Sequence, residues 1–331
     1  MKLKLTPILV FAVLVAATPA LALLSPRETG EHLETLPSTT IGKTDEKKDA
    51  LITVYDEGAK EALTLTEREY LIGAVVTEMP ALYEVEALKA QAVAARSYAL
   101  FVKELREKEP LPELKGGIFS VNTKAHTGYV PEAEARNIYG KNFSLYYDKI
   151  ADAVDEVLEY AVTVDGKPIC ACYHAISTGQ TEASENVFAS ALSYLVPVDS
   201  SFDEAAPGYL STVVFSPSEL NTLLTLNVED FSLSGEPETW FGETKYSPSG
   251  NVTSVILGDR VFSGTEIRTL LNLRSAAFTV NYADSVFTFT VRGYGHGVGM
   301  SQNGANELAK RGESFKDILC YYYTGAAVEK Y

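Results

Sequence analysis

The chain has 331 residues, of which 46% are hydrophobic and 22% charged, a composition typical of a globular protein with a sizeable buried core. Its 44 acidic and 28 basic residues give a net charge of −16, and no basic stripe interrupts this acidity. The balance argues against nucleic acid as a partner. The three cysteines, Cys170, Cys172 and Cys320, do not describe a disulfide framework.

The N-terminus has the pattern of an export segment. Lys2 and Lys4 precede a long apolar stretch, and the letters ALA at 20–22 resemble a signal-peptidase site. The stretch is also close to the roughly 20 apolar residues that span a bilayer, so a retained anchor with the lysines in the cytoplasm is equally consistent. We predict a signal peptide or membrane anchor over residues 1–24 and a flexible tether over residues 25–50. The remainder is then expected outside the cytoplasm.

The folded part is predicted over residues 51–331. It begins with a weakly alternating strand and continues with "TEREYLIGAVVTE", whose apolar residues share one helical face. This helix must end near Glu78, because Pro80 disfavours a helical conformation at Met79. A longer helix follows from Val85.

The second helix is the clearest element in the sequence. Its apolar residues recur at alternating steps of three and four, which predicts a buried stripe that ends at about Leu105. Lys89 and Arg96 lie seven residues apart and share one row of this helix. Without further evidence, the sequence favours an ordinary solvated helix face for Lys89 and Arg96.

Short strands dominate the rest of the chain. "YAVTVDGKPICACYHA" predicts a hairpin that turns at Asp165-Gly166, and residues 200–290 contain short alternating runs separated by Pro, Gly and Ser. This is not a repeating βαβ series. We predict an α+β fold in which a helical segment packs on a strand-rich, two-lobed domain with a substrate cleft.

Glu78 is a candidate general acid. It lies at a helix end with apolar sequence on both sides, and burial beside apolar surface raises the pKa of a carboxyl group and keeps it protonated near neutrality. A protonated carboxyl group can donate to a leaving oxygen. The alternative is an ordinary solvated residue at a helix end.

Two further stretches are candidate binding loops. "RGYGHGVGMSQNGANELAKRG" has glycines at alternate positions around His296, next to a short helix that begins near Ser301. The alternative is a tight structural turn with a buried histidine. In "CACYHAISTGQTE", alternation places two cysteines and His174 on one strand face, but three such ligands cannot surround a tetrahedral ion. We therefore favour small core residues there, followed by a polar loop suited to lining a cleft.

Three stretches together resemble the stage II sporulation protein D family, which is related to the amidase-enhancer proteins of bacterial cell walls. They are "TEMPALYEVEALKAQAVAARSY", "KPICACYHAISTGQTE" and "GYGHGVGMSQNGANELAKRGESFKDILCYYYTG". The resemblance covers roughly residues 60–331. It implies a membrane-anchored lytic transglycosylase that cleaves peptidoglycan glycan strands lacking stem peptides, in the engulfment machinery of sporulating bacteria.

The resemblance also implies residue roles and partners. Glu78 matches the family's catalytic glutamate. The expected substrate-binding residues are Lys89, Arg96, His174, Ser177, Thr181, Glu182, His296, Ser301 and Gln302. The implied partners are the amidase stage II sporulation protein P and the membrane protein stage II sporulation protein M.

The sequence departs from the family pattern in two places. A Cys-x-x-x-His-Cys cluster that binds zinc in some members corresponds here to "VNTKAHTGY", with Asn122, His126 and Thr127. We therefore expect no structural zinc and no other cofactor. Gln180 stands where relatives usually have arginine.

The alternative function is that of a non-catalytic wall-binding protein that enhances an N-acetylmuramoyl-L-alanine amidase. A purely structural tether between membrane and wall is the least favoured hypothesis.

Overall fold

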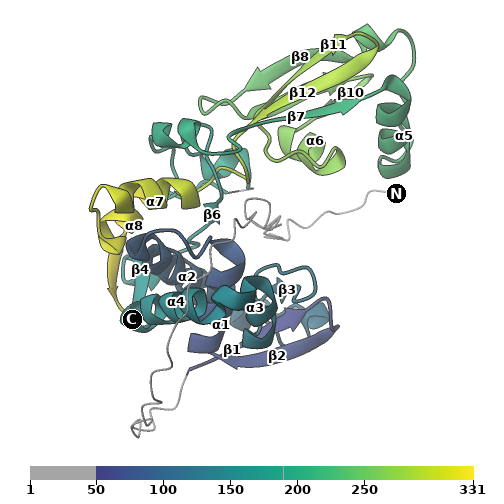
Figure 1. Cartoon of the computed structure of the whole chain (residues 1–331). Helices are drawn as coiled ribbons and strands as arrows, with labels where there is room; N and C mark the ends of the chain where they lie inside the picture. Colours follow the sequence, from purple (N-terminus) through teal and green to yellow (C-terminus); the bar gives the residue numbers. More distant parts are fainter. Residues whose placement is uncertain (1–49, 189) are drawn as a thin grey trace, which may run out of the picture.

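The computed structural model describes residues 50–188 and 190–331 (Figure 1). The predicted anchor at 1–24 and all but the last residue of the predicted tether at 25–50 lie outside these residues. Within the described part, none of the helices combines the length and apolarity that crossing a bilayer requires. The predicted α+β class is confirmed, and the described residues form two lobes with separate hydrophobic cores.

The first lobe is built around a group of helices (Figure 1). They are α1 (Glu67–Glu78), α2 (Val85–Lys108), α3 (Glu132–Tyr139), α4 (Phe143–Val157), α7 (Gln302–Lys310) and α8 (Phe315–Tyr322). Thr66 and Glu69 form a reciprocal capping box that starts α1. The helix ends at Glu78 as predicted, because Met79 adopts an extended conformation before Pro80.

Helix α2 lies at the centre of this lobe. It continues to Lys108, three residues beyond the predicted end. Small side chains such as Ala87, Ala90 and Ala94 are fully buried along it, so neighbouring helices can approach closely. It packs against α1, α4, α7 and α8. The packing of these four neighbours fixes the positions of the side chains that α2 supplies to the interior.

Two small sheets flank the helices. One has the order β2-β1-β3, and the other has the order β14-β4-β5. Their strands are β1 (Leu51–Asp56), β2 (Glu61–Thr66), β3 (Ser120–Val121), β4 (Tyr160–Val164), β5 (Lys167–Pro168) and β14 (Ala327–Lys330). The predicted hairpin of β4 and β5 is confirmed, and both Asp165 and Gly166 have the positive φ that its turn requires.

The second lobe contains two three-stranded antiparallel sheets and two helices, drawn in green in Figure 1. Its elements are β7 (Leu210–Phe215), α5 (Pro217–Asn227), β8 (Phe241–Tyr246), β9 (Val252–Leu257), β10 (Arg260–Phe262), α6 (Gly264–Leu270), β11 (Phe278–Ala283) and β12 (Val286–Arg292). Aromatic side chains fill its core. Trp240 stacks on Phe287, and Phe289 of β12 contacts one aromatic ring from each of the two sheets. The strand-rich prediction for residues 200–290 is thus confirmed.

A parallel pair of two-residue strands lies between the lobes. It joins β6 (Tyr173–His174) to β13 (Met300–Ser301), and β13 leads directly into α7. The predicted strand through Cys170 is therefore shorter than expected, since the backbone turns tightly from Ile169 to Cys172. Gly299 has a positive φ, and a Cβ there would lie 2.1 Å from the Cys172 carbonyl oxygen. Only glycine permits this close approach.

Candidate active site

Glu78 occupies the last residue of α1, where the chain leaves the helix towards the loop of residues 79–84. The side chain is half-buried, and its Oε1 atom is enclosed with no hydrogen-bond partner among the described residues. Gln302 at the start of α7 lies within hydrogen-bonding reach of the carboxyl group. Two tyrosines, Tyr70 and Tyr173, are its electrostatic neighbours.

The environment of Glu78 favours the protonated acid. Burial raises the pKa of this carboxyl group from 4.5 to about 7, and the hydrogen bond to Gln302 offsets only part of the rise. No second carboxyl group contributes to the pKa of Glu78 among the described residues. The group is therefore poised to give up and take back a proton near neutral pH.

The loop that follows Glu78 is held from both sides. Lys149 on α4 donates hydrogen bonds to the carbonyl oxygens of Ala81 at 2.9 Å and Tyr83 at 2.6 Å. Asn306 on α7 accepts a hydrogen bond of 2.8 Å from the backbone N–H of Glu84. These contacts fix the path by which the chain leaves α1, and with it the position of Glu78.

A polar chain continues from Glu78 into the interior. Gln302 donates a hydrogen bond of 3.2 Å to Gln91 of α2, which is fully buried. Ser301 is the N-cap of α7, where its hydroxyl group accepts a hydrogen bond from Gly304. Of the two residues predicted as substrate contacts here, Gln302 adjoins the acid, whereas Ser301 is fully buried and caps the helix.

His174 and His296 come together in the interior, with ring centroids 5.8 Å apart. Both are fixed by the peptide groups of Val298. Nδ1 of His174 lies 3.1 Å from the Val298 carbonyl oxygen, and the Val298 N–H donates to Nδ1 of His296 at 3.1 Å. Burial lowers the pKa of His174 to about 4 and that of His296 to about 3, so both rings are neutral.

The polar loop after His174 does not line an open cleft, contrary to expectation. Ser177 and Thr181 are fully buried and serve the backbone, since the Ser177 hydroxyl group accepts from Gly179 and the Thr181 hydroxyl group accepts from Val198. The Glu182 carboxylate is buried among hydrogen-bond donors. These are Ser247, Ser249, Asn251, Asn186 and the Ala183 N–H. These hydrogen bonds lower the pKa of Glu182 despite its burial, so it is ionised.

Lys89 and Arg96 are engaged in ion pairs within the first lobe. Lys89 pairs with Glu86 at 2.9 Å and Glu156 at 2.5 Å. Arg96, only 7% exposed, pairs with Glu67 at 3.1 Å and donates to main-chain carbonyl oxygens. Both charges therefore have partners inside the fold, and their role in binding substrate stays a prediction.

The segment that matches the family's zinc cluster does not fit a metal. Nε2 of His126 lies 2.8 Å from the Glu134 carboxylate, and Asn122 forms a backbone bridge with Thr127. The neighbouring Asp56 accepts hydrogen bonds from Thr123. Without thiolates this donor set does not suit zinc. Within the described residues, no group of three or more His, Cys, Asp and Glu side chains could hold a metal ion.

Cys170 and Cys172 are buried with their sulfur atoms 3.5 Å apart, and both are free thiols. They belong to the core of the first lobe, together with Ile169 and Ala171. The interpretation of this stretch as small core residues therefore agrees with their placement.

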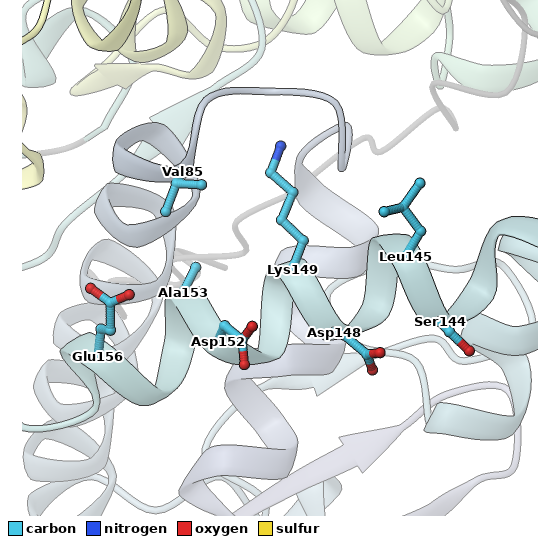
Figure 2. Close-up of a pocket in the computed structure, with 8 residues that line it drawn as sticks. All are labelled: Val85, Ser144, Leu145, Asp148, Lys149, Asp152, Ala153 and Glu156. Carbon is cyan, nitrogen blue, oxygen red and sulfur yellow. The ribbon is translucent and has the colours of Figure 1, made fainter. Parts of the chain in front are cut away.

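A pocket of about 490 Å³ is lined by one side of α4 and by Val85 at the start of α2. Figure 2 shows Lys149 pointing from α4 towards this loop, while Asp148, Asp152 and Glu156 follow the same helix. The Lys149 side chain thus both lines the pocket and contacts the loop of residues 79–84. No sequence motif marks Lys149, and the quoted stretch around Asn306 gives no sign of its partner, because these contacts join segments more than 60 and 220 residues apart.

The fold and the site define an α+β protein with two lobes, in which one partly enclosed carboxyl group with a raised pKa lies at a helix end. Comparison with known proteins extends this class. The profile of the family described as Stage II sporulation protein matches residues 55–163. Stage II sporulation protein D of Bacillus subtilis is 33% identical over 97% of this chain and 96% of its own length. The chain belongs to the stage II sporulation protein D family.

Two further relatives bear on function. Stage II sporulation protein D of Bacillus amyloliquefaciens is 32% identical over 84% of this chain and 78% of its own length. The amidase enhancer of Bacillus subtilis is 28% identical over 79% of this chain but only 40% of its own length.

Proposed function

We propose that this protein is a lytic transglycosylase that cleaves the β-1,4 bond between N-acetylmuramic acid and N-acetylglucosamine in peptide-free glycan strands. The observation that carries the proposal is the carboxyl group of Glu78, which has one enclosed oxygen without a hydrogen-bond partner among the described residues and a pKa raised to about 7. Membership of a family named for sporulation supports a role in remodelling septal wall during engulfment.

One carboxyl group is sufficient for this reaction. Ordinary glycoside hydrolysis uses two carboxyl groups, one as acid and one as base or nucleophile. In the proposed mechanism, protonated Glu78 gives its proton to the bridging oxygen as the bond from that oxygen to C1 breaks. The resulting carboxylate takes the proton of the muramyl 6-hydroxyl group as the oxygen of that hydroxyl group bonds to C1. The product is a 1,6-anhydro end, and Glu78 is again protonated.

The test is product analysis by mass spectrometry. Purified full-length protein is incubated with glycan strands freed of peptides, beside the Glu78→Gln variant, which keeps the shape of the side chain. We expect anhydro ends with the wild type and a rate lower by a factor of about 10²–10⁴ with the variant. Reducing ends would instead show hydrolysis and contradict the mechanism.

The amidase enhancer supports a second candidate function, because its similarity extends over most of this chain. In that reading the protein binds the wall and stimulates an amidase without cleaving glycan. Stimulation of a purified amidase by the Glu78→Gln variant as strongly as by the wild type, with no anhydro products from either, would favour it.

The wider setting is also a proposal. We place the catalytic part outside the cytoplasm, anchored by the N-terminus or secreted after cleavage. Stage II sporulation proteins P and M are the proposed partners, and the glycan strand is the proposed substrate. No cofactor enters the proposed mechanism.

A further inference from the structure

Strand β7 forms one edge of the sheet with the order β11-β12-β7, and within the described residues it pairs only with β12. Just before this strand, the Gly293 N–H donates to the Tyr209 carbonyl oxygen. Because hydrogen-bonded pairs alternate along an antiparallel ladder, the backbone groups of Leu210, Thr212 and Val214 point away from β12. None of these groups has a hydrogen-bond partner in the part of the chain that the structure describes. The outer edge of β7 is therefore a row of free donors and acceptors.

The side chains at the same three positions are exposed. Leu210 is 61% exposed, Val214 is 52% exposed, and Thr212 between them is also exposed. Natural proteins protect an open edge with lysine, proline or a bulge, because an unprotected edge pairs with other strands. The sequence of β7, LSTVVF, has neither a charge nor a proline, and its register with β12 is unbroken. The strand is thus open to pairing with another strand.

The other edge strands of this lobe differ from β7. Strand β8 carries Glu243 and Lys245 and has two register shifts, and β10 has only three residues. On β11 the exposed side chains are Thr279, Asn281 and Ala283, none of which is a large apolar residue. Only on β7 do free backbone groups coincide with exposed, large apolar side chains among the described edge strands of this lobe.

The chain around β7 carries almost no charge. Residues 205–228 contain one charged side chain, Glu219, although 22% of the whole sequence is charged. This range includes α5, in which Leu226 is 78% exposed. Across the ladder the neighbour of Leu210 is Arg292, whose guanidinium group lies against Gly250. A highly charged partner would gain little here, whereas an uncharged strand meets no repulsion even though the chain has a net charge of −16.

We propose that β7 pairs with β7 of a second copy of this chain, antiparallel about a two-fold axis at Thr212, so that two three-stranded sheets become one of six strands. This register makes Leu210, Thr212 and Val214 the hydrogen-bonded positions of the new ladder, so it uses the free backbone groups. It sets Leu210 opposite Val214 of the second copy and the two Thr212 side chains opposite each other. Such apolar and threonine pairs stabilise a sheet. The strand is thus complementary to itself, which favours a second copy over a strand of another protein.

The dimer keeps the two candidate active sites apart. Strand β7 begins close to the loop after β6, where the Tyr209 hydroxyl group donates to the Thr178 carbonyl oxygen. It ends at α5, which lies at the end of this lobe remote from β6 (Figure 1). Since the two strands run in opposite directions, the two first lobes lie at opposite ends of the dimer. Each copy therefore presents its own Glu78, and the dimer is independent of the chemistry at that residue.

Cysteine cross-linking tests the register. Full-length protein with Cys320→Ser lacks its exposed thiol, and Thr212→Cys in this background places two thiols opposite each other at the two-fold axis. The Cα atoms of such a pair are about 5.5 Å apart, within the range of a disulfide. Under mild oxidation we expect a dimer on a non-reducing gel.

Thr290→Cys in the same background is the matched control. Thr290 is exposed and lies beside Thr212 in one row of the sheet, on β12. In the proposed dimer its Cα atom is three strand spacings, about 14 Å, from its counterpart, which is too far for a disulfide. We expect Thr212→Cys to cross-link at least about ten-fold faster than Thr290→Cys.

Sedimentation velocity tests association without a cross-link. We expect the dimer fraction of the full-length wild type to grow with concentration, because pairing of two edge strands makes a small interface. Val214→Lys puts a lysine on the edge and should weaken the dimer by about ten-fold or more. Asn281→Lys changes the same row of the sheet on β11, two strands from β7, and should have no effect. Any association through residues 1–24 is common to all three proteins, so the difference between them assigns the interface.

Three results would overturn the inference. Equal cross-linking rates at Thr212 and Thr290, or a dimer that Val214→Lys leaves unchanged, would place the contact between copies elsewhere. A wild type that sediments as a monomer at every concentration would exclude the second copy and leave β7 to a strand of another protein.

Discussion

At the scale of single residues, the position of Glu78 explains its acidity. Pro80 ends α1 at this residue, and the packing around it encloses one carboxyl oxygen without giving it a donor. An ionised carboxylate is disfavoured in such surroundings, so its pKa rises. Glu182 shows the opposite shift, because its more deeply buried carboxylate accepts several hydrogen bonds that lower its pKa and keep it ionised.

The pH dependence of cleavage should report the pKa of Glu78. Because the protonated form is the acid of the first step, kcat/KM should fall as pH rises through about 7, by roughly ten-fold per pH unit on the basic side. The measurement is the initial rate of anhydro-end formation from about pH 5 to about pH 9. A rate that stayed level across this range would be incompatible with Glu78 as the acid.

The same pKa shift should appear in folding stability. Since the pKa of Glu78 is about 7 in the folded protein and 4.5 as a free side chain, the folded state binds the proton more tightly. The unfolding free energy should therefore decrease as pH rises from about 4.5 to about 7, by roughly 2 kcal/mol once partial exposure is allowed for.

Glu78→Gln is the matched control for this linkage, because its side chain does not titrate. Denaturant titrations of both proteins across this pH range measure the difference. If the unfolding free energies of the wild type and Glu78→Gln changed with pH in the same way, the pKa of Glu78 in the folded protein would equal that of a free side chain.

At the scale of elements, the loop of residues 79–84 depends on contacts from distant helices. Lys149 from α4 and Asn306 from α7 hold its backbone polar groups. The sequence predicted where α1 ends and α2 begins, because proline and apolar periodicity act locally. It did not indicate these two residues, since a lone lysine or asparagine on a helix carries no local signal of its partner.

Replacing Lys149 with methionine should loosen this loop. The variant loses both donors to Ala81 and Tyr83 while it keeps an unbranched side chain of similar length. We expect kcat to fall about ten-fold with a smaller change in KM, and stability to fall by about 1–3 kcal/mol. Hydrogen exchange of the loop amides should quicken.

The control for Lys149→Met is Lys141→Met, which changes an exposed lysine that precedes α4. Exchange and kcat should both match the wild type in this variant. Unchanged loop exchange in Lys149→Met would show that Asn306 and the helix ends hold the loop without the lysine.

At the scale of the whole molecule, Glu182 links the lobes. Its carboxylate belongs to the loop after β6 and accepts hydrogen bonds from Ser247, Ser249 and Asn251, in the turn between β8 and β9. Thr178 adds a hydrogen bond of 2.6 Å to the Ser249 carbonyl oxygen. The lobes therefore meet through buried polar contacts, and each keeps its own apolar core.

Removing the Glu182 carboxylate should uncouple the lobes. In Glu182→Ala, buried donors of the second lobe lose their acceptor, at a cost of at least about 2 kcal/mol. We expect the single thermal transition of the wild type to broaden or divide in calorimetry. Glu243→Gln, an exposed acid on β8, should leave the transition unchanged. A sharp, unsplit transition in Glu182→Ala would show that other contacts couple the lobes.

The sequence by itself determined the helix end at Glu78, the long α2, the hairpin at Asp165-Gly166 and the family, because these depend on local geometry or on matched stretches. Only the tertiary structure decided the partners of polar side chains. Arg96 pairs with Glu67, and the Glu182 carboxylate accepts a hydrogen bond from Ser247 of the second lobe. A charged side chain has the same appearance in a sequence whether it faces substrate or a partner far along the chain, because only folding sets its distance and hydration.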